Sequence, residues 1–172
     1  MKYIEILKKA QKDLTRKSIL TPALDAELIL SNILKIKREK LILNLQKKID
    51  SNNLRLFNSF IEQRKKNIPI AYILKYKHFW KSTFYVNKSV LIPRPATELI
   101  VEKVLEKVPK NQSFKFLDIG TGSGCILISI LLERPKSTGI GIDISPSAIK
   151  VAEFNAKMQQ LKNRIKFINS DV

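Results

Sequence analysis

The chain has 172 residues, of which 44% are hydrophobic and 27% charged, and this composition excludes an intrinsically disordered protein. No apolar run is long enough to cross a membrane, and a single cysteine, Cys125, excludes an internal disulfide, so a cytoplasmic protein is expected. The net charge of +17 is concentrated in residues 1–90, but lysine is abundant throughout, so direct nucleic-acid binding is not the expected role.

The first 70 residues predict a small helical bundle. A first helix follows from apolar residues at helical spacing, and a second is expected to begin at Thr21-Pro22, because Thr is a good N-cap and Pro suits the first helical position. A short helix over residues 38–45 and a longer one capped by Asp50-Ser51 follow. The side chains expected to face the core from the first two helices are Ile4, Leu7, Ala10 and Leu14, then Leu24, Leu28 and Ile29.

Residues 71–95 are expected to connect this bundle to a second domain. Pro69 ends the helical pattern, and residues 72–92 are rich in aromatic and β-branched side chains, which favour strands. Residues 84–86 and 89–92 could pair as a β-hairpin around Asn87-Lys88, although no glycine fixes the turn type.

From residue 96 onward the pattern alternates between helix and strand. A helix over residues 97–107 precedes a strand at 114–119, and two further strands are separated from it and from each other by helices. Such alternation predicts an α/β domain with a parallel sheet and right-handed crossovers. The remaining expected elements are helix 125–133, strand 138–143, helix 146–159 and strand 164–168.

A glycine-rich loop lies where the first of these strands turns into a helix. Gly120, Gly122 and Gly124 would let the backbone turn sharply and approach a ligand, which the amides of the helix N-terminus would face. Asp143 ends the next strand, where an acidic residue receives hydrogen bonds from ribose hydroxyls in folds of this kind. Together these residues predict a site for a nucleoside-bearing cofactor.

Two other readings of the loop and its surroundings are less well supported. A dinucleotide dehydrogenase needs a further glycine three places after the second one, where Cys125 or Leu127 stands here. A metal site or a Ser-His-Asp triad would need more than His78, the only histidine. Cys125 has no base near it in sequence, so a packing role is expected for its thiol.

Several motifs together resemble the peptide chain release factor glutamine methyltransferases. The segment Val90-Leu-Ile-Pro-Arg-Pro95, followed by Thr97-Glu98, is more specific than the loop Asp118-Ile-Gly-Thr-Gly-Ser-Gly124. The other matching segments are Pro69-Ile-Ala-Tyr-Ile73, Phe79-Trp80 and Asn155-Ala156, so the resemblance covers essentially the whole chain.

The resemblance implies a fold, a cofactor and a reaction. It implies a helical domain that docks the release factor (1–70), a β-hairpin connector (71–95) and the first three βα units of a Rossmann-like class I methyltransferase domain (96–172). The reaction transfers a methyl group from S-adenosyl-L-methionine to the glutamine side-chain amide in a Gly-Gly-Gln motif, without a metal. The residues implied to bind the cofactor are Gly120, Thr121, Gly122, Ser123, Gly124, Asp143 and Val172, and Arg94 and Pro95 are implied to form the active-site wall.

The chain also departs from the family pattern. The Asn-Pro-Pro-Tyr motif that orients the acceptor amide is not among these residues, so the catalytic residues are unknown. Ala96 replaces a usual Glu, and Lys75 replaces a usual Gly at a place where the backbone is expected to prefer a positive φ. Two alternatives therefore stay open: a related methyltransferase acting on another protein amide or a nucleic-acid amino group, and an inactive fragment that retains only partner binding.

The predicted sheet leaves one of its strands unpaired. Residues 114–119 would form an exposed apolar edge, since the strand that pairs with them in the family is the fourth. A monomer or weak self-association through that edge is expected.

Overall fold

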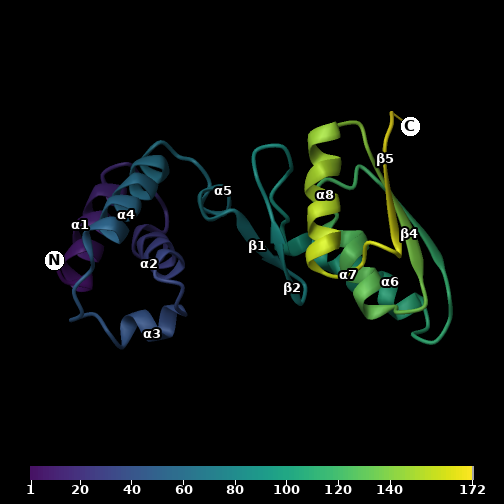
Figure 1. The fold of residues 1–172 in the computed structure, drawn as a ribbon, viewed down its shortest axis with the longest axis horizontal. Coiled ribbons are helices and arrows are strands. Elements are labelled where there is room, and N and C mark those ends of the chain that lie inside the picture. The colour runs from purple at the N-terminus through teal and green to yellow at the C-terminus, as the bar shows by residue number, and fades with distance from the viewer. Residues whose placement is uncertain (172) are drawn as a thin grey trace. The chain divides into compact units, whose positions relative to one another are not determined.

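The computed structural model describes residues 1–171, and the chain divides after Leu74 into two units (Figure 1). Residues 1–74 form the helices α1 (Tyr3–Thr15), α2 (Pro22–Ile33), α3 (Arg38–Ile42), α4 (Ser51–Lys65) and α5 (Ile70–Leu74). Helix α1 packs against α2 and α4, which confirms the predicted helical bundle. The fully buried side chains of its core include Leu14, Ala26, Ile29, Leu30, Leu41 and Phe57.

The predicted inward face of helix α2 was only partly right: Ile29 is fully buried and Leu28 half-buried. Leu24 is 40% exposed, whereas Asp25 is buried. The Asp25 carboxylate accepts a hydrogen bond from the Thr21 hydroxyl (2.9 Å) and pairs with Arg64 Nε of α4 (2.6 Å). A buried carboxylate needs such partners, and satisfying them places the following residues, Ala26, Ile29 and Leu30, in the core.

Helix α4 begins where the sequence predicted. Asp50 is its N-cap, and one carboxylate oxygen accepts hydrogen bonds from the Asn52 and Asn53 amides at 3.0 and 2.9 Å. These bonds satisfy two of the amides that a helix start leaves unpaired.

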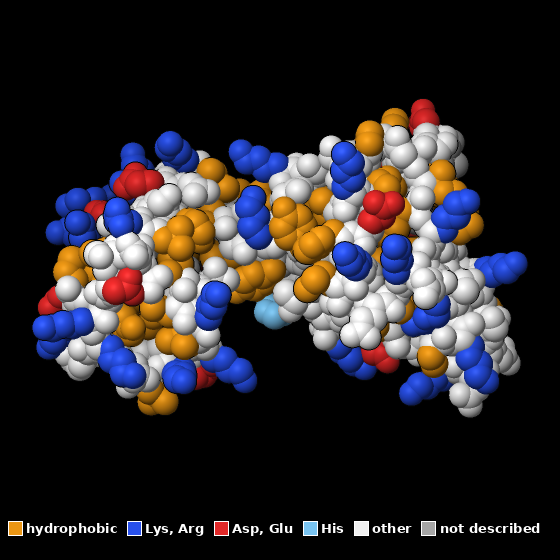
Figure 2. Space-filling model, viewed as in Figure 1, with side chains coloured by type: hydrophobic (Ala, Val, Ile, Leu, Met, Phe, Trp, Pro, Cys, Tyr) orange, Lys and Arg blue, Asp and Glu red, His pale blue; other side chains and the backbone are white. Residues whose placement is uncertain are grey.

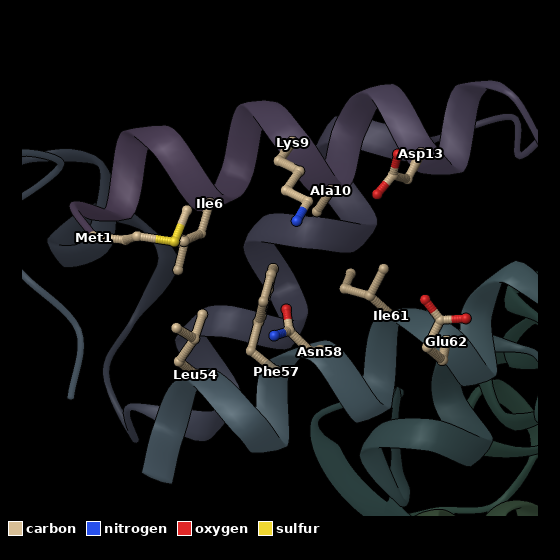
Figure 3. A pocket seen from close by; sticks show the side chains of 10 residues that line it. All are labelled: Met1, Ile6, Lys9, Ala10, Asp13, Leu54, Phe57, Asn58, Ile61 and Glu62. Atoms are coloured by element: carbon tan, nitrogen blue, oxygen red, sulfur yellow. The ribbon is translucent and has the colours of Figure 1, made fainter. Parts of the chain in front are cut away.

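A hollow of about 290 Å³ lies between α1 and α4 (Figure 3). Ile6 and Ala10 of α1 line it together with Phe57 and Ile61 of α4, and charged side chains also contribute to its wall. The core of the bundle is therefore not fully closed along this side. The charged residues of the wall are Lys9, Asp13 and Glu62.

The β-hairpin exists, but the predicted pairing was wrong. Strands β1 (Tyr76–Phe79) and β2 (Ser82–Tyr85) pair antiparallel, with the turn at Trp80-Lys81. Trp80 itself takes the left-handed conformation of the turn, with φ 54°, so no glycine marks it. Residues 87–90, the expected turn and second strand, instead form a turn in which the Asn87 side chain accepts a hydrogen bond from the Ser89 amide (2.8 Å).

The second unit contains the predicted parallel sheet. After η1 (Pro95–Thr97) and α6 (Glu98–Lys107), the chain alternates through β3 (Lys115–Ile119), α7 (Cys125–Glu133), β4 (Thr138–Asp143), α8 (Pro146–Met158) and β5 (Ile165–Asn169). The strands are parallel in the order β3-β4-β5, which confirms the predicted α/β fold class.

The helices of this unit cover one face of the sheet. Figure 1 shows α6, α7 and α8 on the same side, where α7 packs on β3 and β4, and α8 packs on β4 and β5. The opposite face carries apolar side chains that are largely exposed, at 61% for Leu117, 60% for Ile119 and 39% for Ile140. Side chains of the hairpin, Phe79 and Phe84, belong to the core under the helices.

Two arginines bind backbone carbonyls near helix ends, Arg134 at the end of α6 and Arg164 at and after the end of α7. The Arg134 guanidinium donates to the carbonyls of Leu105 and Val108, and the Arg164 guanidinium donates to those of Leu131, Arg134, Pro135 and Ser137. Carbonyls at a helix end lack partners within the helix, so these arginines replace the missing donors.

Candidate functional site

The glycine loop connects the end of β3 to the start of α7, and all three of its glycines have positive φ. The values are 74° at Gly120, 55° at Gly122 and 76° at Gly124. The amides of Gly120 and Thr121 donate to the carbonyl of Ile142 in β4, at 2.8 and 2.9 Å. The loop is thus fixed to the neighbouring strand in a conformation that side chains disfavour.

The three glycines have different surroundings. A Cβ atom at Gly120 would meet nothing within 4 Å, and one at Gly122 would meet only the Gly120 carbonyl oxygen at 3.9 Å. At Gly124 a Cβ would lie 3.0 Å from Ile128 and 3.3 Å from Ala152. The first two glycines therefore border open space that a ligand could fill, whereas Gly124 allows α7 and α8 to pack closely.

Asp143 lies against this loop, as the sequence predicted. One carboxylate oxygen, Oδ2, accepts the Gly122 amide (2.8 Å), and Oδ1 accepts the Ser145 amide (2.9 Å). A carboxylate oxygen can accept more than one hydrogen bond, so both oxygens retain capacity for hydroxyl donors. The half-buried carboxylate beside an open glycine backbone fits a ribose-containing ligand.

Thr121 and Ser123 point into the protein. Both are buried, and the Thr121 hydroxyl donates to the Asp118 carboxylate at 2.8 Å. Burial raises the pKa of Asp118 above its usual value, the Thr121 hydrogen bond opposes this rise, and the nearby charge of Asp143 adds to it. The side chains of Thr121 and Ser123 thus serve the shape of the loop.

The other residues predicted for the site are Arg94, Pro95 and Val172. Arg94 and Pro95 are exposed, and within residues 1–171 no hydrogen bond joins either of them to the glycine loop. Val172 lies outside the described residues. The cofactor and wall roles given to these three residues stay predictions.

Asn155 is a residue at this site to which the sequence analysis gave no role. It is 1% exposed, and its side-chain amide is bonded to Tyr85 of the hairpin and to Ser123 of the loop. The signal in the sequence is an asparagine within the apolar face of α8, at helical spacing from Ala148 and Ala152. Such a residue needs buried partners.

Neither Cys125 nor His78 forms a second candidate site. Cys125 is buried, and burial raises the pKa of its thiol to about 11, so it is not a nucleophile at neutral pH. His78 contacts the Thr83 hydroxyl (2.9 Å) on the hairpin. In the part of the chain that the structure describes, no group of three or more His, Cys, Asp or Glu could hold a metal ion.

The described residues carry charges of both signs on the face that Figure 2 shows. No helix within residues 1–171 is both long enough and apolar enough to cross a membrane. Figure 2 shows Lys and Arg side chains distributed over the visible face, with acidic side chains among them. Basic side chains therefore lie over both units on that face.

Two family models match the chain. Residues 5–74 match the PrmC N-terminal domain, and residues 110–172 match a methyltransferase domain. A solved RNA methyltransferase from Salinibacter ruber, in complex with S-adenosyl-L-homocysteine, is 29% identical over 46% of this chain and 50% of its own, with a TM-score of 0.39. The methyltransferase domain match indicates S-adenosyl-L-methionine as the cofactor.

Curated relatives match both units. The release factor glutamine methyltransferase of Coxiella burnetii is 42% identical over 83% of this chain and 52% of its own length. That of Leptospira interrogans is 40% identical over 98% of this chain and 60% of its own length. The chain thus spans about half the length of the curated relatives it matches. By these matches the chain belongs to the family of release factor glutamine methyltransferases.

Proposed function

We propose that this chain supplies the cofactor-binding half of an enzyme that methylates the glutamine side-chain amide in the Gly-Gly-Gln motif of peptide chain release factors. One observation carries the proposal: Gly120 and Gly122 border open space directly beside the Asp143 carboxylate. The names of the curated relatives supply the substrate class.

Each part of the site has a distinct task in this proposal. The open backbone at Gly120 and Gly122 admits the methionine portion of S-adenosyl-L-methionine, and Asp143 accepts hydrogen bonds from its ribose. When bound, this cofactor would supply a methyl group on positively charged sulfur, which is already activated for transfer to a weak nucleophile such as an amide nitrogen.

The remaining residues of the proposal concern the substrate protein. Arg94 and Pro95 form part of the active-site wall, and the helical unit docks the release factor. The match of residues 5–74 to the N-terminal domain of the family supports this division of tasks. The acceptor-orienting motif is not among the 172 residues, so no catalytic base or amide-binding residue is assigned here.

Binding of S-adenosyl-L-homocysteine, measured by titration calorimetry, tests the cofactor site. We expect the unchanged chain to bind and Asp143→Ala to lower the affinity at least about tenfold, since hydrogen bonds to a charged group are lost. The matched control is Glu102→Ala, which removes an exposed carboxylate of α6 and should leave the affinity unchanged. Equal affinities of all three proteins would overturn the proposed cofactor site.

Transfer of a labelled methyl group tests the reaction. The chain is incubated with S-adenosyl-L-methionine and a purified release factor, with a Gln-to-Ala loop variant of the release factor as the control substrate. Cofactor binding without labelling of either substrate supports a cofactor-binding half that needs further residues for chemistry. Labelling that does not depend on the glutamine would contradict the proposed substrate.

A further inference from the structure

One buried side-chain amide joins three separate segments of the sheet unit. Asn155 lies on the inner face of α8, and its Oδ1 accepts the Tyr85 amide at 2.7 Å. Its Nδ2 donates to the carbonyl of Tyr85 at 3.0 Å and to the carbonyl of Ser123 at 2.9 Å. The last residue of the hairpin and the middle of the glycine loop are therefore bonded to the same side chain.

No apolar residue could replace Asn155 without cost. The amide is 1% exposed, so loss of it would leave the two backbone groups of Tyr85 and the Ser123 carbonyl without this partner in a water-poor region. An asparagine at this position is thus required by backbone groups on two other segments and not by helix α8 itself.

The bond to Ser123 acts on the part of the loop that borders the cofactor space. Ser123 lies between two glycines of positive φ, which have more conformational freedom than any other residue. The Gly122 amide, one residue earlier, donates to Asp143 Oδ2. Fixing the Ser123 carbonyl therefore limits the rotation of a segment that would otherwise disturb the contact between Gly122 and Asp143.

We propose that Asn155 is a positioning residue for cofactor binding, through which docking of the β1–β2 hairpin orders the glycine loop. The inference rests on the proposed function for the identity of the ligand. The chain continues from the hairpin towards Arg94 and Pro95, so Asn155 ties the segment leading to the proposed substrate wall to the loop that holds the cofactor.

Gln159, the C-cap residue of α8, provides a control. It lies one turn beyond Asn155, and its Nε2 donates to the Thr83 carbonyl of β2 at 3.1 Å. Gln159 thus attaches α8 to the same strand, and within residues 1–171 no hydrogen bond joins its side chain to the loop. If Asn155 served only to attach the hairpin, the two residues would affect cofactor binding alike.

The test compares Asn155→Asp with Gln159→Ala. Asn155→Asp keeps the shape and the acceptor for the Tyr85 amide but replaces the donor to both carbonyls with an oxygen. We expect it to weaken S-adenosyl-L-homocysteine binding by about tenfold or more, and Gln159→Ala to change it by less than about twofold. If Asn155→Asp does not fold, Asn155→Ala takes its place, because it removes the donor without adding a buried charge, and the same loss of affinity is expected.

Hydrogen exchange of the backbone amides, followed by NMR without any ligand, gives a second readout. We expect faster exchange at Ser123 and Gly124 in the Asn155 variant and unchanged exchange there in the Gln159 variant. Equal effects of the two variants on affinity and on exchange would overturn the positioning role. If the unchanged chain binds no S-adenosyl-L-homocysteine, the cofactor proposal fails, and the exchange rates alone decide whether Asn155 orders the loop.

Discussion

Lys75 holds a backbone conformation that glycine adopts more easily. Its φ is 65°, as expected from the glycine usual at this place in the family, and its carbonyl accepts the Val86 amide at 3.2 Å. The left-handed conformation costs a residue with a Cβ about 1–2 kcal/mol, part of which glycine loses again through its greater freedom in the unfolded chain.

Lys75→Gly is therefore expected to raise the free energy of unfolding by roughly 0.5–1 kcal/mol. Urea denaturation monitored by circular dichroism measures this difference. Lys77→Gly is the control, because Lys77 lies in strand β1, where glycine only weakens the structure. A loss of stability in both variants would contradict the strain at residue 75.

Cys125 should be inert in the folded chain. With a thiol pKa of about 11, only about one molecule in a thousand carries a thiolate at pH 8. We expect modification by a disulfide reagent to be far slower in the native chain than in urea, where the thiol is exposed. A native rate close to the rate in urea would show that Cys125 is accessible and would contradict its packing role.

At the scale of elements, the cap of α4 gives the stability a specific pH dependence. The pKa of Asp50 is lowered from 3.8, first by the hydrogen bond from the Asn53 amide. A lowered pKa in the folded state means that the charged cap stabilises the fold above pH 3.8 and that this contribution disappears as the pH falls through the folded-state pKa.

Asp50→Asn keeps an oxygen for the cap but removes the charge that the helix N-terminus favours. The unchanged chain should be the more stable one at neutral pH, and its advantage should shrink as the pH falls below 3.8. Urea unfolding at a series of pH values gives the difference in unfolding free energy between the two proteins. Asp171→Asn is the control, because Asp171 is an exposed aspartate that caps no described helix. An advantage that persists unchanged in acid would contradict the role of the charge.

The contact between α7 and β4 depends on Gly139. A Cβ atom there would lie 2.6 Å from Leu127 Cδ1, closer than carbon atoms can approach. Gly139→Ala should lower the free energy of unfolding by roughly 1–3 kcal/mol, whereas Thr138→Ala at the exposed neighbour should have a small effect. Leu127→Ala should cost less in the Gly139→Ala background than alone, because it removes the clash. If the stability losses of the two substitutions simply add, the loss in Gly139→Ala does not come from contact with Leu127.

The sequence predicted the elements of the sheet unit better than those of the hairpin. Helix α7 and strand β4 match the expected bounds, because a buried strand followed by a helix produces a clear change of hydrophobic period. The hairpin was misplaced because residues 72–92 share one strand-like composition and Trp80 takes the turn conformation without a glycine. Helix α5, over Ile70–Leu74, was missed within the same segment.

The residues of the candidate site also differ in whether the sequence could predict them. Gly120, Gly122 and Asp143 could be predicted because one strand–helix–strand unit brings them together through fixed spacing. Asn155 received no role because its partners, Tyr85 and Ser123, reach it only through tertiary packing. A pattern read along one segment contains no information on such partners.

At the scale of the whole molecule, the uncovered face of the sheet predicts association between chains. Within residues 1–171, strand β3 is paired on one side only, and its side chains Leu117 and Ile119 are 61% and 60% exposed. Apolar edge strands pair readily with other chains. Sedimentation velocity should therefore show association that increases with protein concentration.

Leu117→Lys should reduce this association, since it places a charge on the uncovered face. The control is Leu20→Lys, which adds the same charge at a leucine that is 95% exposed in the helical unit. Equal reduction by both variants would mean that net charge, and not the sheet face, governs association. A chain that stays monomeric at all concentrations would contradict the prediction outright.

Arg134 and Arg164 limit which arginine codons of this gene can mutate to lysine codons. The chain has 25 lysines but only 7 arginines, and single-base changes convert some arginine codons into lysine codons. A planar guanidinium reaches several carbonyls at once, which a lysine ammonium cannot do in the same geometry. We therefore expect a nucleotide bias towards lysine codons to spare codons 134 and 164, because each of these two arginines binds several backbone carbonyls at once.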